Sequence, residues 1–185
     1  MKEHIDLKDI LKKGYLTDEL DLERALILDK KLRLLVKEFP EFIEDRKQLR
    51  QIIKAYEKIH WSSCSDISDA QIKESDDAEI LVEQERKFSK IRKNMIQKKI
   101  SKYKLSQQDL GILLGHNKSY MSELMNGINP FSNRDLIILH RLFDIKLEYL
   151  IPTFISQKDK WKLKESITKL NIPELGLDKK NLELV

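Results

Sequence analysis

The sequence predicts an all-α protein, and three observations support this class. Only five of the 185 residues are glycine and four are proline, so the residues that punctuate strands and turns are scarce. Apolar residues recur at steps of three and four, the period of an amphipathic helix. An apolar fraction of 41% can support buried cores. This length suits one large or two small helical domains.

The N-terminal part, residues 1–61, is expected to form an acidic helical domain. A short helical turn is predicted over 6–11, and a longer helix over 20–39 that Pro40 ends. A third helix over 45–60 should pair antiparallel with the second. The apolar sides of the second and third helices consist of Leu22, Leu26, Leu28, Leu32, Leu35 and Val36, and of Leu49, Ile52, Ile53, Tyr56 and Ile59.

The composition changes after residue 61. Residues 62–77 are rich in serine and aspartate and contain few large apolar residues. We predict a linker over 62–85, in which helix could resume from about Ala78. At the other end of the chain, 153–185 is expected to hold one further helix, over 158–170, and a polar tail.

The stretch from Leu105 to Gly127 spells two short helices joined by a tight turn. Ser106 is placed to cap the first helix, with Asp109 at the distance of a capping box, and Gly115 ends it. The second helix is expected to end at Asn126 and Gly127. The two helices should share a small core of Leu110, Leu113, Leu114, Met121, Leu124 and Met125. Such a pair of helices is typical of the helix-turn-helix, whose second helix enters the major groove of DNA.

The outward side chains of this motif are the candidate DNA contacts. Lys118 can bond the O6 and N7 acceptors of guanine, and Ser119 can donate or accept a bond beside it. Gln107 lies at the start of the first helix, where the backbone N–H groups favour an anion such as a phosphate. Weaker candidates are Asn117, Tyr120, Ser122 and Asn126, the last of which could instead shape the turn with Gly127. The alternative for each residue is an ordinary exposed helix position.

Charge is distributed unevenly along the chain. Residues 1–85 carry 15 basic and 21 acidic residues, a net of −6, whereas residues 86–185 carry 20 and 10, a net of +10. Between residues 86 and 104 there are nine basic residues and no acidic one. This run can neutralise DNA phosphates, although a solvated helix face would have the same composition. The phosphate-contact candidates are Lys98, Lys99, Lys102 and Lys104.

Residues 105–127 resemble the helix-turn-helix of phage-repressor-like (XRE-type) proteins. The resemblance extends to a lead-in helix over about 88–100 and to the segments 132–143 and 144–152, which are similar to the closing helices of that family. It covers roughly 65 residues of the chain. It implies a five-helix DNA-binding domain over 86–152 that binds double-stranded operator DNA as a homodimer.

A second resemblance concerns the N-terminal part. Residues 49–60 end in Tyr-Glu-Lys-Ile-His, similar to the helix that precedes the helix-turn-helix in one branch of HigA-type antitoxins, and Leu139-His140-Arg141-Leu142 fits the same branch. The resemblance implies a type II antitoxin that neutralises a HigB-like mRNA-cleaving toxin through its acidic domain and represses its own operon. The chain departs from the family in its longer, more acidic linker and in the segment after Pro152. The alternative is a stand-alone XRE-type regulator with a ligand-sensing or dimerising N-terminal domain.

The sequence gives no sign of an enzyme, a metal site or a cofactor. The four histidines lie far apart, Cys64 is the single cysteine, and there is neither a glycine-rich phosphate loop nor a Gly-x-Ser-x-Gly motif. No apolar run approaches the roughly 18 residues of a membrane helix, and the charged N-terminus does not resemble a signal peptide. We therefore expect a cytoplasmic protein that is not attached to a membrane.

Overall fold

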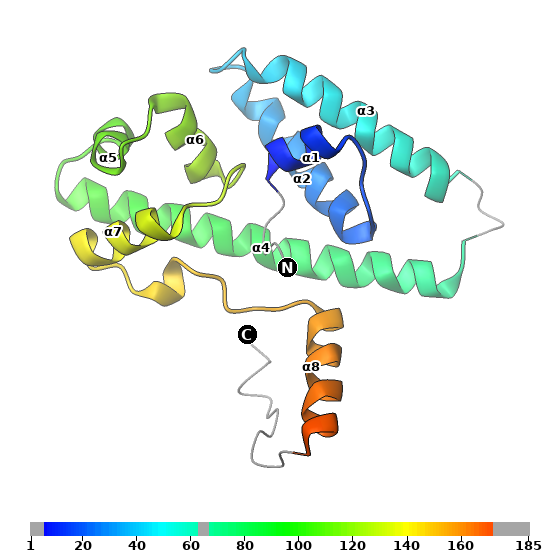
Figure 1. Cartoon of the computed structure of the whole chain (residues 1–185). Coiled ribbons are helices and arrows are strands. Elements are labelled where there is room, and N and C mark those ends of the chain that lie inside the picture. Colours follow the sequence, from blue (N-terminus) through cyan, green and yellow to red (C-terminus); the bar gives the residue numbers. More distant parts are fainter. Residues whose placement is uncertain (1–5, 63–66, 172–185) are drawn as a thin grey trace.

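A computed structural model describes residues 6–62 and 67–171, and this part of the chain consists of helices and connecting segments without strands (Figure 1). The predicted all-α class is confirmed for these residues. The elements are α1 (Leu7–Lys13), α2 (Glu19–Leu35), α3 (Phe42–His60), α4 (Asp69–Lys102), α5 (Gln107–Leu114), α6 (Lys118–Asn126), α7 (Asn133–Phe143), the 3-10 helix η1 (Leu147–Tyr149) and α8 (Gln157–Leu170).

Helices α1, α2 and α3 form an N-terminal module with its own core. The antiparallel pairing of α2 and α3 is confirmed (Figure 1). Two sequence expectations were wrong here. Helix α2 ends at Leu35, well before Pro40, because the chain turns inward to bury Phe39 against Phe42. Ile59 was expected in the core but is 75% exposed, because at this end of α3 it is Tyr56 and Trp61 that contact the start of α2, where both bond to Glu19.

The predicted linker over 62–85 is wrong in that helix resumes at Asp69, well before the expected Ala78. Residues 69–85 form the first half of α4, a 34-residue helix capped by the Ser68 side chain, which accepts a bond from Gln71 N–H. This half packs against α2 through the buried residues Ala78, Leu81 and Val82. Three apolar residues on one face of the helix are enough for this contact, and the serines and aspartates lie mainly on the solvent side.

The second half of α4 supports α5, α6 and α7. Ile96 and Ile100 of α4 are buried with residues of α5, α6 and α7 and of the segment after α7 in a second core. The rest of that core consists of Leu110, Leu114, Met121, Leu124, Met125, Phe131, Leu139, Phe143, Ile145 and Leu150. Leu113, which was expected there, is 44% exposed, because it points away from the face shared by its neighbours Leu110 and Leu114.

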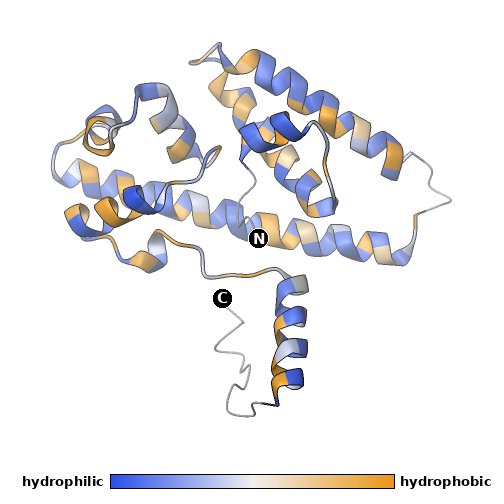
Figure 2. Ribbon diagram, viewed as in Figure 1, coloured by the Kyte–Doolittle hydropathy of each residue, from blue (hydrophilic) through white to orange (hydrophobic). Residues whose placement is uncertain are grey.

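Helix α8 projects away from the rest of the molecule (Figures 1 and 2). Most of its apolar side chains are exposed, with Trp161 and Leu170 each at 66%. The predicted helix over 158–170 is therefore confirmed, while the tail from residue 172 lies outside the described residues. Among the residues described, no helix has both the length and the apolar character needed to cross a membrane.

Candidate nucleic-acid interface

The turn between α5 and α6 has the local geometry that the sequence predicts. Ser106 and Asp109 form a reciprocal capping box, and the bonds from the Ser106 N–H and hydroxyl hold the pKa of the Asp109 carboxyl below its usual value. Gly115 ends α5 with φ of 78°, in the left-handed region that favours glycine. Asn117 then caps α6, its Oδ1 accepting from Tyr120 N–H at 2.8 Å.

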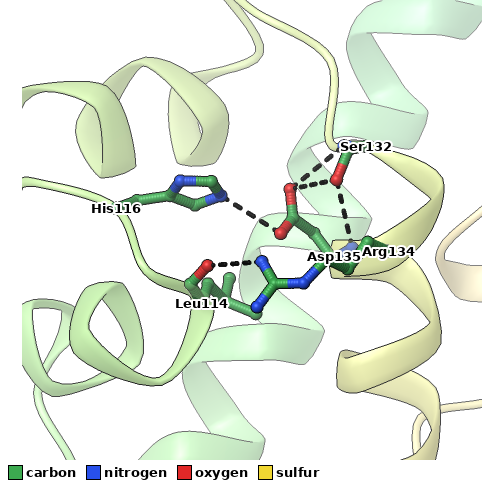
Figure 3. Close-up of polar contacts among 5 residues, drawn as sticks. All are labelled: Leu114, His116, Ser132, Arg134 and Asp135. Atoms are coloured by element: carbon green, nitrogen blue, oxygen red, sulfur yellow. Dashed lines mark hydrogen bonds and ion pairs between the residues drawn. The ribbon is translucent and has the colours of Figure 1, made fainter.

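A buried polar network fastens this turn to α7 (Figure 3). Asp135, which is 1% exposed, accepts bonds from the Ser132 N–H and hydroxyl at 3.1 and 2.7 Å, and His116 Nε2 lies 3.1 Å from its other oxygen. Arg134 Nη1 donates to the Leu114 carbonyl oxygen at 2.9 Å. The last carbonyl of α5 and His116 in the turn are thus held from the first turn of α7, which restricts the angle between the two short helices.

The two favoured DNA-reading residues begin α6, and both contact the N-terminal module. Lys118 Nζ lies 3.2 Å from Glu38 Oε1 and 5.6 Å from the ring centre of Phe39. The Ser119 hydroxyl donates to Glu41 Oε1 at 3.0 Å. Glu38 and Glu41 belong to the turn between α2 and α3, so two carboxylates lie where a helix-turn-helix would approach a phosphate backbone.

Two other candidates, Ser122 and Asn126, form hydrogen bonds within the protein. Ser122 is 6% exposed, and its hydroxyl accepts a bond from the Asn126 side chain. Asn126 in turn donates to the Ser122 carbonyl and accepts from Lys93 Nζ at 2.7 Å. The expectation that Ser122 points outward is wrong, because its position in α6 turns it toward the interior. The polar groups of Asn126 are used to tie the end of α6 to α4.

Tyr120 and Gln107 are the remaining candidates for DNA contact, and both are half-buried. The Tyr120 ring is half-buried and packs edge-on against His116, with Lys8 Nζ of the N-terminal module 5.9 Å from its centre. Burial is the main reason that the pKa of the Tyr120 hydroxyl is raised. Gln107 is the half-buried first residue of α5, at the position from which the sequence predicts a phosphate contact.

The N-terminal module also holds the end of α6 through buried contacts. Ile128, just after α6, is fully buried in the core of the module. Lys31 of α2 donates to the Gly127 carbonyl oxygen at 2.8 Å. A Cβ on Gly127 would lie 3.2 Å from Lys31 Nζ and 3.3 Å from the Ser89 hydroxyl oxygen, and the φ of 65° favours glycine as well. Burial, with Arg92 nearby, lowers the pKa of the Lys31 ammonium to about 8.

Several acidic side chains lie close together where α6 contacts the N-terminal module. Glu123 of α6 is 8% exposed and accepts a bond from the Asn129 side chain at 2.6 Å. Its pKa is raised, first by burial and then by Asp6, Asp45 and Glu41 of the N-terminal module, while Lys8 opposes the shift. Burial and these neighbouring carboxylates therefore disfavour the ionised form of Glu123 at this contact.

In the basic run over 86–104, some side chains are exposed and others are buried or bonded within the protein. Lys98, Lys102 and Lys104 are exposed and remain available to phosphates. Lys99 instead donates to the Asp144 carbonyl oxygen at the end of α7, at 2.8 Å. Arg92 is buried altogether, at 8% exposure.

Sequence reasoning missed the partners that face α6. Glu38 and Glu41 lie about eighty residues away in the chain from the lysine and serine that they contact, and no local pattern signals such a pairing. The buried acid Asp135 did have a signal, the same Ser-x-x-Asp spacing that marks the start of α5.

No family model, characterised protein or solved structure matches the chain. Among the described residues, no group of three or more histidine, cysteine, aspartate or glutamate side chains is arranged to hold a metal ion.

Proposed function

We propose that the protein binds duplex DNA through α5 and α6 and acts as an antitoxin that represses its own operon. The observation that carries the DNA-binding part is the α5–α6 pair. A side chain caps the start of each helix, and Gly115 ends the first helix in the left-handed conformation. Lys118 and Ser119 begin the second helix. Exposed lysines at the end of α4 supply the sequence-independent attraction to phosphate. The arrangement fits an XRE-type domain binding its operator as a homodimer.

The antitoxin part rests on the resemblance to HigA-type antitoxins and on the acidic N-terminal half. An acidic surface would attract a basic RNase toxin of the HigB kind and compete with its RNA substrate. Because α4 spans both halves of the chain and Ile128 enters the N-terminal core, toxin bound to the module would also influence α6. Neutralisation and repression would then be coupled.

A stand-alone regulator is the second candidate. It is favoured by the contacts between the N-terminal module and the start of α6. A module that contacts Lys118 and Ser119 directly can control DNA binding without any protein partner. In this reading a signal that moves α1, α2 and α3 would expose the start of α6.

Co-expression with the neighbouring reading frame distinguishes the two candidates. If the protein is an antitoxin, the product of that gene arrests growth when expressed alone, and the full chain restores growth and co-purifies with it. Absence of both rescue and co-purification, together with retained binding to its upstream DNA, would leave the regulator as the function.

Lys118 provides a specific prediction for the reading helix. In a Glu38→Gln background, which removes the ion pair, Lys118→Ala should cost roughly 1 to 3 kcal/mol of binding to DNA from upstream of the gene and little on random DNA. Lys98→Ala, the control, should weaken binding to both DNAs by similar factors. Titrations of both duplexes at one salt concentration measure the difference. Equal losses for Lys118→Ala on the two DNAs would make Lys118 a phosphate contact.

A further inference from the structure

A cleft lies where the N-terminal module meets α4 and the segment that follows η1. Its volume is about 1020 Å³. One wall is formed by α1, the start of α2 and the turn between them, and another by α4 from Leu81 to Arg92. The segment 152–156, which leads into α8 (Figure 1), lines the remaining side. A cleft of this size can hold an organic molecule.

Arg92 is the polar group that distinguishes this cleft. Its guanidinium lies between the rings of Phe88 and Phe131, 5.4 and 5.2 Å from their centres. It makes one long hydrogen bond, 3.4 Å, to the Leu150 carbonyl oxygen. Within residues 6–62 and 67–171, no carboxylate forms an ion pair with it, and burial alone lowers its pKa to about 10. A guanidinium offers five N–H donors, so most of its bonding capacity is unused.

The carboxylates nearby do not compensate this charge, because they are engaged elsewhere. Glu85, the nearest one along α4, receives two bonds from Arg24, one of them from Nε at 3.0 Å. Asp18 caps α2, and the Asp159 carboxylate accepts a bond from the hydroxyl of Ser156, the residue that caps α8. Lys31 adds a second buried positive charge beside Arg92. A buried charge without a partner is costly, so the site favours an anion.

Most of the exposed area that lines the cleft is apolar, although charged side chains, among them Lys12, Lys13 and Lys162, also border it. Phe88 and Phe154 pack edge-on with their ring centres 6.0 Å apart, one from α4 and one from the closing segment. Ile10, Leu81 and Pro152 also face the cleft. The aspartates at its rim disfavour a dianion such as a phosphate monoester, whereas a single carboxylate matches the planar fork of one guanidinium.

We propose that the cleft binds an amphiphilic monocarboxylate, whose carboxylate pairs with Arg92 and whose apolar chain lies against Ile10, Phe88 and Phe154. This site is separate from α5 and α6 and does not depend on the proposed DNA-binding or antitoxin function. Its occupant touches the N-terminal module, α4 and the segment before α8 at once.

Calorimetric titration of the full chain with decanoate, below the micelle concentration, tests the proposal. For a ligand of about a dozen non-hydrogen atoms we expect a dissociation constant on the order of 10 to 100 µM. Decanol, which lacks the charge, and inorganic phosphate, which lacks the chain, should each bind at least about tenfold more weakly. No heat and no thermal stabilisation with decanoate, or equal binding of decanol, would overturn the proposal.

Substitutions in the cleft test whether the carboxylate of decanoate binds at Arg92. Arg92→Gln should weaken decanoate binding at least about tenfold, whereas Arg86→Gln, an exposed arginine on the same helix paired with Glu83, should leave it unchanged. Phe154→Ala, in the closing segment, tests the apolar contact without touching Arg92 and keeps the proposal falsifiable if Arg92→Gln does not fold. Unaltered affinity in Phe154→Ala and in a folded Arg92→Gln would show that decanoate binds elsewhere.

Discussion

Replacing Glu38 and Glu41 together with lysine is expected to raise the affinity for duplex DNA of any sequence about tenfold at low salt. The two carboxylates contact Lys118 and Ser119 at the start of α6, where they repel a phosphate backbone. The lysines would remove that repulsion and add up to two phosphate contacts, each contributing about −0.9 to the slope of log affinity against log salt. Fluorescence anisotropy with a labelled random duplex, at several salt concentrations, measures both the affinity and the slope.

The matched control changes the same net charge elsewhere. Glu57 near the end of α3 and Glu74 near the start of α4 are both exposed, and neither contacts α6 in the structure (Figure 1). Glu57→Lys with Glu74→Lys therefore reports the effect of overall charge alone. If this control binds DNA as tightly as the Glu38 and Glu41 double variant, the turn between α2 and α3 does not restrict access to α6.

The expected gain is limited because these surface contacts are not what holds the module in place. The Lys118–Glu38 pair is exposed on both sides, at 63% and 59%, and such pairs contribute at most about 1 kcal/mol. Burial of Ile128 and the bond from Lys31 to Gly127 are the stronger connections. A toxin or ligand that binds the N-terminal module differently when α6 is free would therefore shift DNA affinity, and DNA would shift the affinity for that partner equally.

Local signals in the sequence were sufficient for the helix ends of the candidate site. Ser106, Gly115 and Gly127 act within four residues of the groups they bond, so their roles could be read from spacing alone. The sequence did not distinguish the buried face of α6 from its exposed face as well. Ser122 is polar but lies on the buried side, since the network with Asn126 satisfies its hydroxyl.

Long-range packing explains the larger errors. The first half of α4 looks like a linker because its own sequence has too few apolar residues to form a core, and α2 supplies the missing surface. Tertiary contacts commonly override such local preferences. The contacts of the N-terminal module with α6 are also long-range, because Lys31, Glu38 and Glu41 contact residues that lie 78 to 96 positions later in the chain.

Asp135→Ala is expected to destabilise the protein by about 2 to 3 kcal/mol, because the variant removes a charged acceptor that is almost fully buried. The bonds from Ser132 to the Asp135 carboxylate and the His116 contact would both be lost, and the α5–α6 turn would be held only by Arg134 on that side (Figure 3). The free energy of unfolding, from urea titration, measures the loss. DNA binding should also weaken in conditions where the variant is still folded, because the angle between α5 and α6 is less restricted.

Asp109→Ala is the matched control for this prediction. It removes the acid of a capping box of the same type at the start of α5, where the side chain is more exposed and bonds only to Ser106. Water can replace an exposed carboxylate as the partner of the freed donors, but it cannot reach the site of Asp135 as readily. The control should therefore lose clearly less stability. A loss for Asp109→Ala as large as that for Asp135→Ala would mean that capping alone, and not the buried link between α7 and the turn, accounts for the effect.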